Sequence, residues 1–217
     1  MFGFGDSKRK IFCISFQRTG TTSVGEFFGS FGFRVATWPV SRANKWTLKW
    51  FEGDYESIFN SKDFRDHNVF EDDPWWCLDF YKVLFHRFPA STFVHFTRNS
   101  DAWFDSMIRH SNGRTLGNTY RHARIYRRES EFYRKFGSGN YSDDEIDNLL
   151  ELNESHRRHY IEIYESRNRD IPDFFDRNDP GRLISLRLED SQKWKKLGGF
   201  FDLKVPENLE VHANRSK

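Results

Sequence analysis

The segment ISFQRTGTTSV, from Ile14 to Val24, contains residue types that bind an anion. A short apolar run leads into a turn with a glycine, and hydroxyl side chains follow at the expected start of a helix. The free N–H groups and the positive end of a helix dipole attract phosphate or sulfate, and Arg18 adds a cation. The segment departs from the phosphate-loop pattern G-x-x-x-x-G-K-[ST], because Ser15 replaces the first glycine and Thr21 replaces the lysine. We expect the binding turn to comprise Gln17, Arg18, Thr19, Gly20, Thr21, Thr22 and Ser23.

A second candidate anion site consists of Arg98 and Ser106. Arg98 follows the apolar run STFVHFT, and Ser106 comes eight residues later in a predicted helix. A planar guanidinium binds phosphate through two N–H groups, and a serine hydroxyl supplies a further donor. The structural alternative is a surface ion pair between Arg98 and Asp101 or Asp105.

Three adjacent carboxylates, Glu71, Asp72 and Asp73, precede Pro74. Like charges raise one another's pKa, and a raised pKa suits a general base. Alternatively, Asp72 or Asp73 caps a helix that begins at Pro74. Asp73 fits that cap better, so Asp72 is the preferred catalytic base and Glu71 the second candidate, with a histidine elsewhere in the chain as the remaining alternative.

Several other side chains have both a functional and a structural interpretation. Trp75 and Trp76 either line an acceptor pocket or pack in the core, and Trp38 or Trp46 is a candidate for stacking on adenine. His110 lies four residues beyond Ser106 and could face the same cleft, whereas His95 alternates with apolar residues and is expected inside. The residues Cys13 and Cys77 are expected as buried free thiols, without a disulfide or a zinc site.

Strands and helices alternate along the chain. The predicted strands cover residues 10–16, 33–38, 67–71, 91–97 and 183–188. The predicted helices cover 21–32, 43–51, 75–88, 101–110 and 142–167, the last with a capping box at Ser142 and Glu145, and a short helix surrounds Trp194. This order predicts a three-layer α/β fold with a mainly parallel central sheet flanked by helices. Ligands bind at the carboxyl ends of the strands in such sheets, where all three candidate groups fall.

Composition indicates one folded domain over residues 1–217. Aromatic residues make up 18% of the chain, too many for a disordered protein despite the 30% of charged residues. A net charge of +2 gives no indication of nucleic-acid binding. We find neither a secretory signal nor a transmembrane segment, so the expected location is the cytoplasm.

The motifs also resemble those of a known family. FQRTGTTS resembles the 5′-phosphosulfate loop of sulfotransferases, with arginine in place of the more familiar lysine, and RNSDAWFDS resembles their 3′-phosphate motif. The stretch LISLRLEDSQKWKKLGGFFDLKVPE is similar to their closing segment, whereas 112–144 has no clear match. The resemblance implies a P-loop-like fold with a helical cap inserted at about 109–168.

The resemblance further implies transfer of a sulfuryl group from 3′-phosphoadenosine-5′-phosphosulfate (PAPS) to an acceptor hydroxyl or amine. The base of the family, commonly two residues before a proline, corresponds to Asp72, while Arg18 would stabilise the leaving group and Trp103 would pack beneath the nucleotide. No metal is expected. A carbohydrate, a lipid-linked compound or a small molecule are all open as acceptors. Two rival interpretations are a magnesium- and ATP-dependent kinase and a non-catalytic protein that binds partners.

The region beyond the second motif is rich in arginine. These side chains either recruit an anionic acceptor, such as a polysaccharide or a membrane surface, or form a solvated helix surface. They are Arg109, Arg114, Arg121, Arg124, Arg127, Arg128 and Arg134.

Overall fold

The computed structural model describes residues 9–110, 120–139, 150–207, 209 and 211. Its centre is a five-stranded parallel sheet in the order β2-β3-β1-β4-β5. The strands are β1 Ile11–Cys13, β2 Val35–Ala36, β3 Val69–Phe70, β4 Thr92–Thr97 and β5 Leu183–Arg187. The predicted strands are all present, each shorter than expected, and the α/β fold with a parallel sheet is confirmed.

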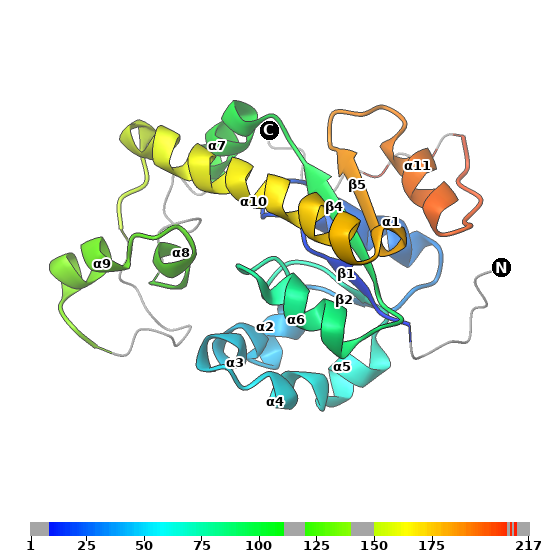
Figure 1. Cartoon of the computed structure of the whole chain (residues 1–217), viewed down its shortest axis with the longest axis horizontal. Coiled ribbons are helices and arrows are strands. Elements are labelled where there is room, and N and C mark those ends of the chain that lie inside the picture. The colour runs from blue at the N-terminus through cyan, green and yellow to red at the C-terminus, as the bar shows by residue number, and fades with distance from the viewer. Residues whose placement is uncertain (1–8, 111–119, 140–149, 208, 210, 212–217) are drawn as a thin grey trace.

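Helices cover both faces of the sheet (Figure 1). One face packs against α1 (Thr21–Ser30) and α11 (Lys193–Phe200). The other packs against α6 (Phe80–Arg87), α7 (Ser100–Arg109) and α10 (Arg157–Asn178), and α10 crosses in front of the strands in this view. This arrangement is the expected three layers.

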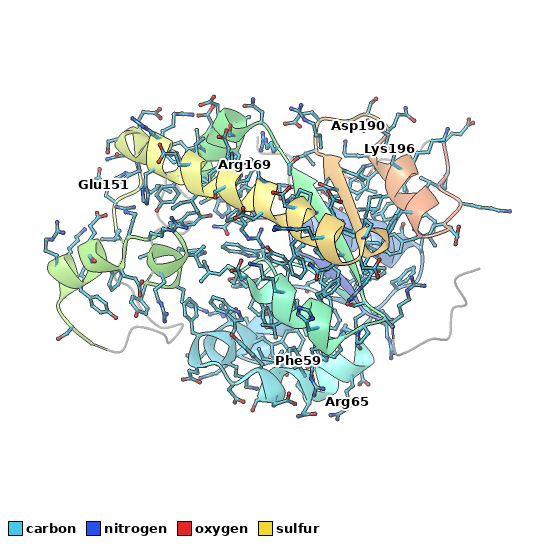
Figure 2. All side chains as sticks on the ribbon, viewed as in Figure 1. Phe59, Arg65, Glu151, Arg169, Asp190 and Lys196 are labelled. Carbon is cyan, nitrogen blue, oxygen red and sulfur yellow. The ribbon has the colours of Figure 1, made fainter. Side chains whose placement is uncertain are left out.

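Aromatic side chains form much of the core on the second face (Figure 2). Phe12 of β1 lies at its centre, with ring centroids 5.2 Å from Phe70, 5.7 Å from Phe93 and 5.5 Å from Trp75. Such pairs contribute roughly 1 kcal/mol each beyond their burial. This packing explains how a chain with so many charged residues holds a rigid sheet.

The segment between β2 and β3 is more helical than predicted. In place of one helix at 43–51 there are α2 (Trp38–Ala43) and α3 (Trp46–Glu52), separated at Lys45, whose φ is 51°. Two five-residue helices that were not predicted follow, α4 (Tyr55–Phe59) and α5 (Lys62–Asp66).

Two of the predicted helices have wrong boundaries. The helix predicted at 75–88 begins at Phe80, because the backbone forms successive turns from Pro74 to Asp79. The helix predicted at 142–167 does not run through 150–153; α10 begins at Arg157 after a short 3₁₀ turn, Glu154–His156, with Asn153 in a capping box. The helix then continues to Asn178, because Ile171 and Phe175 extend its buried face. Ser142 and Glu145 lie outside the described residues.

The region predicted as a cap contains α8 (Tyr120–Ile125) and α9 (Glu129–Phe136), which lie to one side of the sheet (Figure 1). Its final part belongs to α10, whose Tyr160 and Tyr164 enter the main core. In the part of the chain that the structure describes, no helix combines the length and the apolar character needed to cross a membrane.

Candidate active site

The turn after β1 is built around Gly20. Its φ of 88° lies in the left-handed region, which favours glycine, and a Cβ atom at this position would lie 2.8 Å from Leu188 Cδ1, so that leucine side chain would have to shift. The Thr19 hydroxyl donates to the Phe16 carbonyl and is thus used inside the turn. The N-cap residue Gly20 has no side chain that could cap α1, and no acidic residue lies in the first turn of this helix, which leaves a positive helix end at Thr21, Thr22 and Ser23.

Arg18 connects the two predicted anion motifs. Its Nε donates to Ser106 Oγ at 3.0 Å, and Arg98 Nη1 donates to the Arg18 carbonyl at 3.5 Å. Burial, and then the charges of Arg98 and Arg109, hold the pKa of Arg18 below its usual value. The structure therefore gathers three guanidinium groups and the Ser106 hydroxyl at the carboxyl edge of the sheet.

The alternative of an ion pair between Arg98 and Asp101 or Asp105 is wrong. Both carboxylates instead pair with Arg157 of α10, at 3.0 Å and 2.5 Å. Within the described ranges no carboxylate lies at ion-pair distance from Arg98. Its charge is thus available to an anion.

Gln17 has an unusual environment. Its side chain is only 6% exposed, yet neither Oε1 nor Nε2 forms a hydrogen bond with a described residue. Its carbonyl accepts a hydrogen bond from Trp103 Nε1 at 3.0 Å, so Trp103 packs beneath the turn as expected. Buried polar groups are nearly always paired, so the Gln17 amide can bond to a ligand or water beside this turn.

The three carboxylates lie in different environments. Glu71 is 2% exposed and its Cγ faces Gly25 of α1; burial, and then the charge of Asp72, raise its pKa to about 8. Asp72 is half-buried, with a φ of 70°, and accepts the Asp73 N–H at 2.8 Å; burial raises its pKa. Burial and Asp72 raise the pKa of Asp73 to about 7, which Arg121 of α8 opposes. Burial thus raises the pKa of all three carboxyl groups, and the charge of Asp72 raises the pKa of Glu71 and of Asp73 further.

The predicted helix cap at this turn is also wrong. The Trp75 N–H bonds to the Asp72 carbonyl at 3.1 Å within a turn, and no helix begins at Pro74. Neither aspartate is therefore occupied as a helix cap here.

The two tryptophans after the acidic turn are both buried. Trp75 is fully buried beside Phe12, Phe70 and Trp46, so its proposed place in an acceptor pocket is wrong. Trp76 is 1% exposed; its ring stacks on His122 of α8, with centroids 6.2 Å apart, and packs at a tilt against Phe16, with centroids 5.5 Å apart. Trp76 therefore packs against α8 and is not part of an exposed acceptor pocket in this structure.

Of the tryptophans considered for adenine, Trp46 is fully buried and unsuitable. Trp38 is 46% exposed at the start of α2, and its backbone N–H donates to the Glu71 carboxylate. The ring of Trp38 thus stays accessible at the same edge of the sheet as the acidic turn.

The environments of two histidines and both cysteines can be compared with the expectations. His95 is buried, with Nδ1 on Ser185 and Nε2 on Asn168, each at 3.0 Å, and is confirmed as a satisfied interior residue. His110 lies near Arg18, which together with burial lowers its pKa. Cys13 and Cys77 are confirmed as buried free thiols. Among the described residues no group of three or more histidine, cysteine or acidic side chains could hold a metal.

Comparison with known proteins identifies the family. A family model described as a sulfotransferase domain matches residues 10–217. The chain belongs to the sulfotransferase-domain family. A search of curated proteins finds no match. The matched range of the sulfotransferase domain includes 112–144, where motif comparison alone showed no resemblance.

Sequence reasoning placed the main groups of this sulfotransferase domain but missed some of the residues that hold them. Tyr164 and Arg167 of α10 contact the loops that follow β4 and β1, respectively, through hydrogen bonds to Arg98 and to the Ile14 carbonyl. Each contact joins residues far apart in sequence. No local pattern indicates such a contact.

Proposed function

We propose that this sulfotransferase domain transfers the sulfuryl group of PAPS to an acceptor hydroxyl, without a metal ion. The observation that supports this most directly is the meeting of Arg18, Arg98 and Ser106 at one edge of the sheet. PAPS carries a phosphosulfate at one end and a separate 3′-phosphate on its ribose. Two adjoining groups of anion ligands suit such a molecule better than a single phosphate loop would.

The residues present fit both ends of PAPS. The uncapped start of α1 and the glycine turn would hold the 5′-phosphosulfate, with the unpartnered Gln17 amide beside them. Arg98, which lacks a described carboxylate partner, and Ser106 would hold the 3′-phosphate. A kinase would instead require the phosphate-loop lysine that Thr21 replaces.

The residues of the site would have different roles in the reaction. Bound PAPS would supply an activated sulfuryl group. Arg18 and the N–H groups of the turn would stabilise the charge that develops on the leaving phosphate, and such donors typically contribute about 3 kcal/mol each.

We propose Asp72 as the group that accepts the proton of the acceptor hydroxyl. It is half-buried and so more accessible than Glu71, which is 2% exposed, and burial raises its pKa as suits a general base. Glu71 is the second candidate and would act mainly through its effect on Asp72. Carbohydrates, lipid-linked compounds and small molecules all provide a suitable hydroxyl.

Calorimetry with 3′-phosphoadenosine-5′-phosphate, the expected product, tests the cosubstrate site in the absence of metal. We expect micromolar binding that weakens at least about tenfold in Arg18→Ala and in Arg98→Ala, because each change removes a charged hydrogen-bond donor. Arg169→Ala is the control, since Arg169 is exposed on α10 (Figure 2).

The outcomes of this experiment separate the candidate functions. Binding that depends on both arginines would justify a screen of acceptors with labelled PAPS. Failure to bind, together with magnesium-dependent binding of ATP, would reject the proposal in favour of a kinase.

A further inference from the structure

A single side chain of α10 holds the backbone of Arg98. The Tyr164 hydroxyl accepts the Arg98 N–H at 2.8 Å and donates to the Arg98 carbonyl at 3.1 Å. Both backbone groups of this residue, which comes directly after β4, are therefore satisfied by one hydroxyl. Buried or half-buried backbone groups need such partners, because leaving them unpaired is costly.

The ring of Tyr164 is itself fixed between the two anion motifs. It stacks on Trp103 with a centroid distance of 4.2 Å and an angle of 15°, and lies 5.3 Å from Phe16. Trp103 in turn donates to the Gln17 carbonyl. Tyr164 therefore contacts the scaffold of the first motif while it bonds to the backbone of the second.

Neighbouring contacts hold the same loop from both sides. Glu165, the next residue of α10, accepts the Ser100 hydroxyl at 2.7 Å, and Glu189 accepts the Asn99 N–H at 2.8 Å. Of these three contacts, only that of Tyr164 is made to Arg98 itself. Its loss would free the backbone from which the Arg98 guanidinium extends to the Arg18 carbonyl.

We infer that Tyr164 is a positioning residue for the 3′-phosphate end of the cosubstrate site, acting through Arg98. This role rests on the proposed function. A displacement of about 1 Å in a positioned group can lower a reaction rate up to about a hundredfold. A displaced guanidinium likewise loses charged hydrogen bonds to a phosphate. The Tyr164 hydroxyl is therefore expected to affect nucleotide affinity through the position of Arg98.

Tyr160 provides a matched control on the same helix. It is also a fully buried tyrosine, but its hydroxyl accepts from Arg128 Nη1, at 3.1 Å, beside the cap helices. Replacing either tyrosine with phenylalanine removes one buried hydroxyl and keeps the ring. Only Tyr164→Phe removes the bonds to Arg98.

The test compares two nucleotides by calorimetry, 3′-phosphoadenosine-5′-phosphate and adenosine 5′-phosphate, which lacks the 3′-phosphate. We expect Tyr164→Phe to weaken the first by about tenfold and the second by less than roughly twofold. Tyr160→Phe should leave the ratio of the two affinities unchanged. In an Arg98→Ala background, Tyr164→Phe should have no further effect on the ratio, because the group it positions is gone.

An equal loss for both nucleotides, or the same loss in the Arg98→Ala background, would overturn the positioning role and leave Tyr164 as a general structural residue. The positioning role would also be overturned if the ratio of the two nucleotide affinities were the same in Tyr164→Phe as in wild type. A wild type that binds both nucleotides with the same affinity would overturn the proposed 3′-phosphate site itself, and the role of Tyr164 with it.

Discussion

Glu71 combines an ionisable group with almost complete burial, and this has a consequence for stability. Burial raises its folded-state pKa to about 8 from an ordinary 4.5. Between these values the folded protein keeps a proton that the unfolded chain releases. The free energy of unfolding should therefore fall as pH rises from about 4.5 to about 8, by up to about 1.4 kcal/mol per pH unit from this group.

Replacing Glu71 with glutamine should remove that contribution, because an amide stays neutral at every pH and can still accept the Trp38 N–H. We expect urea unfolding to show a smaller loss of stability between pH 5 and pH 8 for Glu71→Gln than for wild type, by a few kcal/mol. The exposed Glu52→Gln serves as control. An identical pH dependence in wild type and Glu71→Gln would show that Glu71 ionises normally in the folded protein.

At the scale of single residues, the sequence predicted site residues best where a charged side chain directly follows a predicted strand. Arg18, Asp72 and Arg98 were predicted because each follows an apolar run, and parallel strands bring such positions to one edge. The sequence could not place Trp75, since a tryptophan beside a candidate base looks the same whether it packs inward or outward. Tyr164 was missed because its bond to Arg98 spans 66 residues.

At the scale of elements, apolar runs located all five strands, but helix boundaries followed local signals less well. Ser142 and Glu145 formed a capping pattern, yet Asn153 is the cap that precedes α10 in the structure. The helices α4 and α5 were missed because five residues are too few to show a helical period. Packing against the sheet fixes these elements more strongly than their own sequence does.

The helix α11 offers a direct comparison of two adjacent glycines. A Cβ atom on Gly198 would lie 2.1 Å from Val205 Cγ2 and 3.1 Å from the Leu203 carbonyl, whereas one on Gly199 would meet nothing within 4 Å. Gly198→Ala should therefore cost about 1–3 kcal/mol of unfolding free energy through overpacking. Gly199→Ala should be neutral or stabilising by up to about 1 kcal/mol, through helix propensity.

Chemical denaturation of the two α11 variants distinguishes these effects. Equal behaviour of the two would mean that the segment after α11 yields easily and does not fix the helix against the sheet. A difference of the expected sign would establish that this closing segment is packed as tightly as the core. The comparison is internal, because both variants add one methyl group to the same helix.

At the scale of the whole molecule, Arg128 links the cap helices to α10. It is 5% exposed and binds the Glu131 carboxylate through Nε and Nη2, at 2.7 Å and 2.6 Å. The same guanidinium donates to the Tyr160 hydroxyl at 3.1 Å and to the Glu151 carbonyl at 2.9 Å. One buried side chain thus joins α9, the segment before α10 and α10 itself.

Replacing Arg128 with methionine should loosen the cap without unfolding the sheet. The Glu131 side chain is 43% exposed and would be solvated, so the cost is that of losing charged hydrogen bonds, typically about 1.5–3 kcal/mol, and it should appear where the partners lie. We expect faster amide hydrogen exchange in α8 and α9, with β1 and β4 still protected, because proteins open in cooperative local units. Arg158→Ala is the control, since this arginine of α10 is 92% exposed and pairs only with Glu162 in the ion pairs described.

The same variant tests whether nucleotide binding belongs to the sheet or to the cap. Arg18, Arg98 and Ser106 come from the loops after β1 and β4 and from α7, none of which Arg128 contacts. Arg128→Met should therefore keep its affinity for 3′-phosphoadenosine-5′-phosphate while α8 and α9 exchange faster. A parallel loss of protection in β1, β4 and the cap would instead mean that the molecule opens as one unit, and nucleotide affinity would then fall with it.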